Sequence, residues 1–136
     1  MEYIAAVDPG REKCGLALMS TAGEVIEQRV VPRREALTHL SMWHRRHLLK
    51  TIVLGNRTGS RQFAQEIEES PLGARVPISL VEEHLSTLEA RERYFTARPP
   101  RGWRRLIPVS LQVPPEPYDD FVAVILGERY LKGRRT

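Results

Sequence analysis

The chain has 136 residues, a length that suits one compact domain and is too short for two nucleotide-clamping lobes. Hydrophobic residues make up 41% and charged residues 28%, a composition typical of a globular protein. Lysine and arginine number 21 against 17 acidic residues, an excess that favours polyanionic partners such as nucleic acid. The single cysteine, Cys14, excludes an intrachain disulfide and a thiolate zinc site built within the chain. No apolar stretch reaches membrane-spanning length and no signal-peptide pattern is present, so we expect a cytoplasmic protein without a membrane partner.

Three short apolar segments open the sequence and predict β-strands. They cover residues 3–7, 15–19 and 25–31 and are separated by polar turns. Residues 25–31 alternate between apolar and polar side chains, which is typical of a strand at the edge of a sheet. We therefore expect an antiparallel meander.

Helical and extended patterns alternate in the next part of the chain. Apolar residues spaced by three and four predict an amphipathic helix over residues 36–48, with His44 on its buried side. Residues 51–54 predict a strand, and the turn-rich residues 55–60 lead into a short helix. The result is a β-loop-α unit.

The same order recurs in the second half. Residues 76–81 predict a strand, Ser86 and Glu89 predict a capping box that opens a helix through Phe95, and residues 118–131 predict a closing helix. A three-strand meander followed by alternating α and β elements predicts an α/β fold, with a mixed five-stranded sheet flanked by helices.

Residues 96–117 contain six prolines, so we expect an insertion or lid rather than a regular element. Residues 106–113 are compatible with one extra extended piece between proline boundaries. We expect this insertion to belong to a single domain that spans residues 1–136.

Basic residues gather near that insertion. Between Arg91 and Arg105 there are six arginines and one acid, Glu92, together with aromatic residues. Such a mixture suits phosphate contacts and base stacking, although a solvated arginine-rich loop is the alternative. A second candidate is the loop at residues 55–60, which either receives a phosphate at a helix N-terminus or is a simple tight turn. The candidate nucleic-acid-binding residues are Lys13, Arg57, Arg91, Arg98, Arg101, Trp103, Arg104 and Arg105.

Acidic residues stand at the ends of three predicted elements. Asp8 follows the first strand, where an aspartate considered alone more often caps its own turn. Glu82 and Glu83 end a later strand, and only one of them can share the sheet side that Asp8 uses, because consecutive strand residues face opposite sides. Asp119 and Asp120 open the last helix, where either is also favourable as a cap. The apolar residues that follow Asp119 at helical spacing favour it narrowly as the inward-facing one.

The predicted strand order brings these element ends together. Hard divalent cations prefer oxygen ligands, and two such ions roughly 4 Å apart can activate a water and stabilise a leaving oxygen in phosphodiester cleavage. The carboxylates therefore predict a centre for Mg²⁺ or Mn²⁺, with two ions expected.

Three segments resemble one known family. IAAVDPGREKCGLAL is similar to the first-strand motif of the YqgF and RuvC resolvases, VEEHLSTLEAR to the YqgF pattern DERLSTxEA, and YDDFVAVILGERYL to the closing helix of that family. The matches occur in the family's order over nearly the whole chain. The resemblance implies an RNase H-like fold, with Asp8, Glu83 and Asp119 as catalytic, metal-binding acids, and with Lys13 and Gly15 as members of the first motif. Glu82 and Asp120 are the less favoured ligands.

The sequence departs from the family at two places. Glu82-Glu83-His84 replaces Asp-Glu-Arg, so a histidine stands where an arginine is expected. The Pro/Arg-rich insertion is longer than the family's basic loop, and Glu116-Pro117 lies where lysines are common.

The function expected from these features is metal-dependent endonuclease action on structured nucleic acid. The resemblance implies either processing of the 16S ribosomal RNA precursor, which we favour, or cutting of Holliday junctions and other branched DNA. A non-catalytic nucleic-acid-binding module is the second hypothesis, although acidic residues repel a phosphate backbone unless cations bridge them. A third compares D-P-G-x-x-x-x-G with the phosphate loop of actin-like and sugar-kinase ATPases, which need two such domains. The sequence leaves open the cleavage position, the preferred metal and the choice between monomer and dimer.

Overall fold

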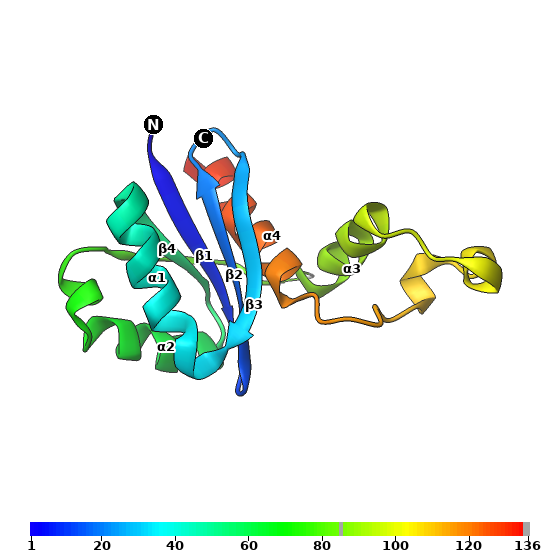
Figure 1. Ribbon diagram of the computed structural model, residues 1–136, viewed down its shortest axis with the longest axis horizontal. Coiled ribbons are helices and arrows are strands. Elements are labelled where there is room, and N and C mark those ends of the chain that lie inside the picture. The colour runs from blue at the N-terminus through cyan, green and yellow to red at the C-terminus, as the bar shows by residue number, and fades with distance from the viewer. Residues whose placement is uncertain (85, 135–136) are drawn as a thin grey trace.

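The computed structural model describes residues 1–84 and 86–134, whose strands form one mixed five-stranded sheet in the order β3-β2-β1-β4-β5 (Figure 1). Neighbouring strands are antiparallel from β1 through β2 to β3 and parallel from β1 through β4 to β5. The predicted meander, mixed sheet and edge position of β3 are therefore confirmed. The strands are β1 (Tyr3–Pro9), β2 (Lys13–Ser20), β3 (Val25–Pro32), β4 (Leu49–Gly55) and β5 (Ile78–Val81).

Helices cover both faces of the sheet. Figure 1 shows α1 and α2 on one face and α4 on the other, while α3 and the segment after it extend away from the sheet. The helices are α1 (Arg33–His47), α2 (Thr58–Glu68), α3 (Ser86–Ala97) and α4 (Asp119–Arg134), with short 3-10 turns η1 (Pro71–Ala74), η2 (Gly102–Leu106) and η3 (Val109–Leu111). No helix in the described part of the chain is long and apolar enough to cross a membrane.

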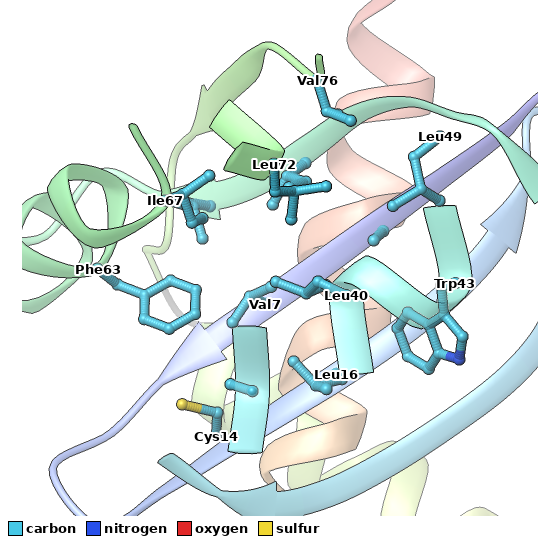
Figure 2. Packing of buried hydrophobic residues seen from close by; sticks show 14 of the residues in the cluster. Val7, Cys14, Leu16, Leu40, Trp43, Leu49, Phe63, Ile67, Leu72 and Val76 are labelled. Carbon is cyan, nitrogen blue, oxygen red and sulfur yellow. The ribbon is translucent and has the colours of Figure 1, made fainter. Parts of the chain in front are cut away.

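The central strands are buried on both faces because their side chains alternate. In β1, Ala5 and Val7 pack under α1 and α2 in the cluster of Figure 2, whereas Ile4 and Ala6 belong to a second cluster on the α4 side. β2 divides its side chains in the same way. A strand enclosed on both faces is held rigidly, which fixes the residues at its carboxyl end.

The helix predicted over residues 36–48 ends one residue early. Leu48 has a φ of 48° and is 74% exposed, so it caps α1 in the left-handed conformation and does not join the core. His44 is only partly buried, and its Nδ1 accepts a hydrogen bond from the Leu49 backbone N–H at 3.0 Å. The expectation for Leu48 was wrong because the chain must turn there to enter β4.

Two expectations in the second half also fail. Residues 106–113 form no strand but contain the end of η2 and all of η3, since prolines at both boundaries leave few backbone donors for a ladder. The capping box is not formed as predicted, because Ser86 is already helical and the Glu89 carboxylate accepts a hydrogen bond from Arg129 instead.

Candidate active site

The predicted carboxylates meet at the sheet edge where the parallel strands end. Asp8 lies near the end of β1, and Glu83 follows β5 by two residues. Asp8 is paired in register with Gly15 of β2, and the first turn of α4 rests on Gly15 so closely that a Cβ there would overlap the Asp119 backbone carbonyl. Only glycine permits this approach, which brings Asp119 beside the strand pair that carries Asp8.

Glu83 is the most enclosed of these acids, with a side chain only 8% exposed. Its Oε1 accepts a hydrogen bond from Ser60 Oγ at 3.2 Å, and its Oε2 lies 2.8 Å from Arg57 Nε. The carboxylate packs against Gly55 at the end of β4, where a Cβ would overlap it. A buried carboxylate needs such partners because an unpaired charge would be costly there. Glu82, by contrast, is exposed, as expected if only one of the two glutamates faces the site.

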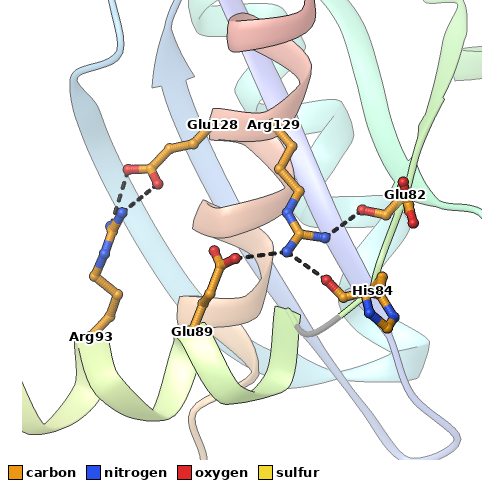
Figure 3. A network of polar contacts seen from close by, with 6 residues as sticks. All are labelled: Glu82, His84, Glu89, Arg93, Glu128 and Arg129. Atoms are coloured by element: carbon orange, nitrogen blue, oxygen red, sulfur yellow. Dashed lines mark hydrogen bonds and ion pairs between the residues drawn. The ribbon is translucent and has the colours of Figure 1, made fainter.

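Arg129 of α4 fixes the turn that carries Glu83 (Figure 3). Its guanidinium donates to the backbone carbonyls of Glu82 and His84, both at 2.7 Å, and to Glu89 Oε1 at 2.9 Å. The two carbonyls belong to the residues on either side of Glu83. The planar guanidinium thus links α4 and α3 to this turn and restricts the position of Glu83.

The two aspartates of α4 face different neighbours. Asp119 Oδ2 lies 3.7 Å from Lys13 Nζ, and Asp119 lines the same hollow as Asp8, of about 390 Å³. Asp120 Oδ2 accepts a hydrogen bond from Gln28 Nε2 of β3 at 2.9 Å, and its Oδ1 is buried without a hydrogen-bond partner among the described residues. The structure therefore groups Asp119, and not Asp120, with Asp8.

The electrostatics of Asp8 link all three acids. Burial, followed by the negative charges of Asp119 and Glu83, raises the pKa of Asp8 from 3.8 to about 7, while Arg57 opposes this rise. Such a shift means that the site disfavours a third uncompensated negative charge. Groups perturbed in this way are common at functional sites. Asp8, Glu83 and Asp119 together form the carboxylate edge of the protein.

The donor set of the carboxylate edge fits a hard divalent cation by its chemistry. All its ligands are carboxylate oxygens, and a cation would relieve the repulsion that helps to raise the pKa of Asp8. Among the described residues, however, no three potential ligands lie close enough to hold one ion. Glu83 contacts Arg57 and Ser60 instead, and Asp119 contacts Lys13.

The predicted nucleic-acid-binding residues lie on different elements of the structure. Lys13 and Arg57 contact the carboxylate edge. Arg91 Nε donates to the Tyr118 hydroxyl at 3.1 Å, and Tyr118 lines the hollow that contains Asp8 and Asp119. The remaining candidates lie on the segment that follows α3, and all are exposed: Arg98, Arg101, Trp103, Arg104 and Arg105.

The sequence did not predict that three residues hold Glu83 in place: Gly55, Ser60 and Arg129. Arg129 carried one signal, because it is a cation within a largely apolar helix, but its carbonyl partners lie 45 and 47 residues away. Ser60 and Gly55 belong to a loop whose sequence predicted only a turn or a phosphate contact. Their contact with Glu83 depends on the parallel pairing of β4 with β5 and on the packing of α2 against β1 and β4.

Comparisons with known proteins agree with the architecture. No known family's sequence profile matches the chain, and no curated protein sequence does either. Among solved structures, the chain is similar to T. thermophilus RuvC in complex with Holliday junction substrate, with a TM-score of 0.62 and 16% sequence identity over 99% of this chain and 96% of that one. At this identity the likeness shows the fold alone, so the chain has the RNase H-like fold that it shares with RuvC.

Proposed function

We propose that the chain is a metal-dependent nuclease that hydrolyses phosphodiester bonds in structured nucleic acid. The observation that carries this proposal is the meeting of Asp8, Glu83 and Asp119 at one sheet edge, where burial and the two neighbouring charges raise the pKa of Asp8 to about 7. A protein that only binds nucleic acid gains nothing from carboxylates in this position, because they repel phosphates. Together with a cation, the same carboxylates become useful.

In this proposal Asp8, Glu83 and Asp119 hold Mg²⁺ or Mn²⁺, which when bound supplies an activated water and neutralises charge at the phosphate. The chain's own residues set the positions. Gly55 leaves room for the Glu83 carboxylate, and Arg129 holds the turn around it.

Two cations of the chain complete the site. Lys13 and Arg57 place side chains that are 50% and 64% exposed beside the carboxylates, where they are available to phosphate oxygens. Each would then exchange a carboxylate partner for a phosphate partner when substrate binds. Without substrate, Lys13 and Arg57 thus neutralise carboxylates, and with substrate they would neutralise phosphates.

Two candidate substrates arise from separate considerations. The sequence resemblance to the YqgF group favours the 16S ribosomal RNA precursor. The structural neighbour was solved with a Holliday junction, which favours branched DNA as the second candidate. Neutralisation of the phosphate backbone serves both, so the choice depends on contacts with bases and with the 2′-hydroxyl.

The proposal is tested by incubating the purified chain with labelled precursor 16S RNA and with a synthetic four-way DNA junction, in Mg²⁺, Mn²⁺ or chelator. We expect cleavage that requires the metal, that is lost in Asp8→Asn and that persists in the control Glu82→Gln, whose side chain is exposed. The substrate that is cut assigns the role. Tight binding without cleavage in any metal would instead identify a non-catalytic module.

A further inference from the structure

The segment between α3 and α4, residues 98–117 (the arm), leaves the body of the protein and carries an exposed indole. Figure 1 shows it extending away from the sheet. Gln112 Nε2 ties its two halves together by donating to the carbonyls of Arg104 and Ile107 at 2.8 and 2.9 Å. Trp103 in η2 is 68% exposed, and Arg104 Cζ lies 5.9 Å from the centre of its ring. A large aromatic ring left open to solvent on a tied loop is available for stacking.

The charge of the arm is almost wholly positive. It contains four arginines, Arg98, Arg101, Arg104 and Arg105, against one acid, Glu116. Glu116 is already neutralised, since its Oε2 lies 2.9 Å from Arg98 Nη1. No carboxylate among the described residues pairs with the other three arginines. Their charge is therefore open to an external anion such as a phosphate backbone.

A hollow of about 600 Å³ lies where the arm joins α3. Tyr94 and Phe95 form part of its wall, and Arg98, Arg101 and Arg104 line it as well. This volume lies in the range of sites for one small organic molecule. It therefore suits a nucleotide and is too small for a duplex.

The hollow at the arm connects the carboxylate edge with Trp103. It shares Pro115 and Glu116 with the hollow that contains Asp8 and Asp119. It shares Arg104, Gln112 and Pro115 with a smaller hollow beside Trp103, so Pro115 lines all three hollows. A strand that lay in these hollows in turn would run from the carboxylate edge to the tip of the arm.

We propose that the arm binds an unpaired stretch of the substrate strand, with a base stacked on Trp103 and phosphates on Arg101, Arg104 and Arg105. Stacking on a side chain needs a base face that is covered in a continuous duplex. The arm thus selects nucleic acid that carries unpaired nucleotides next to the paired region at the carboxylate edge. This inference rests on the proposed nuclease function in one respect, which is that the bound strand leads to the carboxylate edge to be cut. The binding of unpaired nucleotides to the arm does not depend on that function.

The test measures binding in chelator, so that no cleavage interferes. Fluorescence anisotropy compares a blunt DNA duplex with the same duplex carrying a single-stranded tail, and RNA versions of both show which sugar is preferred. We expect the tailed duplex to bind roughly tenfold more tightly than the blunt one, since one stacked base contributes about 1–3 kcal/mol. Trp103→Ala should remove that preference, whereas Trp103→Phe should retain most of it.

A matched control and a direct optical signal separate stacking from general apolar contact. Leu111, also on the arm, is 76% exposed, so Leu111→Ala removes apolar surface without removing a ring and should leave the preference unchanged. Of the two tryptophans, Trp43 is buried and Trp103 exposed. Tailed duplex should therefore quench the tryptophan emission of the wild type and not that of Trp103→Phe.

The outcomes distinguish this inference from the proposed function. Equal affinity for tailed and blunt duplex, or an equal loss on both in Trp103→Ala, overturns the inference and leaves the nuclease proposal to its own cleavage test. Loss of the preference in Leu111→Ala as well would show that the arm makes a general apolar contact, which also overturns it. Failure to bind any of the four nucleic acids also overturns the inference, because contacts with Trp103 and the arginines need no metal, and it leaves the metal-dependent nuclease proposal to the cleavage test.

Discussion

The carboxylate edge and the arm use charge in opposite ways. At the edge, Glu83 contacts Arg57 and Ser60, and Asp119 contacts Lys13, so two of the three acids have partners among the residues that the structure describes. In the arm, Arg101 and Arg105 are exposed, and neither forms an ion pair with a described residue. The edge is thus fixed from within, whereas the arm presents its charge to solvent.

This difference reflects the size of what each region is expected to bind. A small cation needs ligands at defined distances, and such ligands must be held by surrounding contacts like those of Arg129. A flexible polymer needs charge and flat apolar surface over a longer span, without one geometry. Substitutions at the edge should therefore change the chemistry, and substitutions in the arm should change affinity.

The largest expected effect is that of Glu83→Gln, which keeps the shape of the side chain but removes its charge. If Glu83 is a metal ligand, the cleavage rate falls by about a hundredfold or more. Raising the protein concentration should not restore it, whereas it should overcome the defect of Trp103→Ala. Single-turnover cleavage across a range of protein concentrations measures both. If the Glu83→Gln defect also vanished at saturation, the edge would be acting only in binding.

Arg129→Gln should produce the next largest effect. It removes the donors to the Glu82 and His84 carbonyls and to Glu89, and we expect a loss of about 1–3 kcal/mol in the free energy of unfolding, because these bonds involve a charged donor. The turn that carries Glu83 should also become mobile and cleavage should slow. Urea unfolding and cleavage assays measure the two effects.

Arg93→Gln is the matched control for Arg129→Gln. Arg93 forms two hydrogen bonds with Glu128 on the same pair of helices (Figure 3), but its side chain is 48% exposed against 24% for Arg129, and it donates to no described residue of the turn that carries Glu83. Such a surface pair contributes about 0–1 kcal/mol. If Arg93→Gln slowed cleavage as much as Arg129→Gln, the effect would come from the docking of α3 and not from the position of Glu83.

How far the sequence predicts these two regions depends on which signals are local. The order of the strands and the placement of Asp8 at the end of β1 follow from alternation and turn residues, which act over a few positions. Helical spacing favoured Asp119 over Asp120, whereas face geometry showed only that one of Glu82 and Glu83 faces the site, and the family resemblance implied Glu83. In the structure the charges of Glu83 and Asp119 act on Asp8. Their metal-binding and catalytic roles remain predictions.

Other features depend on contacts between distant segments. The hydrogen bond from Arg129 to the His84 carbonyl joins α4 to a turn 45 residues away, and no local sequence pattern predicts such a contact. Leu48 fits the helical spacing of α1, yet it turns outward because β4 must begin at the next residue. In the arm, prolines prevent a regular element, but its 3-10 turns and its hollow depend on contacts such as that of Gln112.

The pKa of Asp8 predicts how stability changes with pH. Its pKa is about 7 in the folded protein and 3.8 ordinarily. Between these pH values Asp8 is ionised in the unfolded chain and still protonated in the folded protein. The free energy of unfolding therefore falls as the pH rises from about 4 to about 7, and above that pH Asp8 causes no further change. Asp8→Asn has no carboxyl group at this position, so its free energy of unfolding should not show this fall with pH.

Thermal unfolding in chelator from pH 4 to pH 8 tests that expectation. The melting temperature of Asp8→Asn relative to the wild type should rise by several degrees across the lower part of this range and level off above about pH 7. Added Mn²⁺ should reduce this difference in melting temperature, because the metal binds and stabilises the wild type. A gap that does not change with pH would mean that Asp8 is not held in the protonated form.

Arg57→Gln gives the smallest and most specific effect. Arg57 is paired within the protein, as the acids of the carboxylate edge are, and is also exposed to solvent, as the arginines of the arm are. It neutralises Glu83 from within the protein, yet its side chain is 64% exposed and open to a phosphate. A cation that uses Glu83 must compete with it. We therefore expect Arg57→Gln to bind Mn²⁺ roughly tenfold more tightly, since the cation no longer competes with an ion pair for the buried Glu83 carboxylate, and to bind nucleic acid more weakly.

Arg61→Gln is the charge-matched control for this variant. Arg61 lies in the first turn of α2, four residues after Arg57, which precedes that helix. It is exposed and forms no ion pair with any described residue, so its loss removes the same charge from the same end of α2 without touching Glu83. Calorimetric titration of Mn²⁺ into both variants and the wild type separates the two effects. A gain confined to Arg57→Gln places Glu83 among the metal ligands, because only there does the cation replace a direct contact. An equal gain in both variants reflects net charge alone, and no gain in either excludes competition between Arg57 and the metal for Glu83.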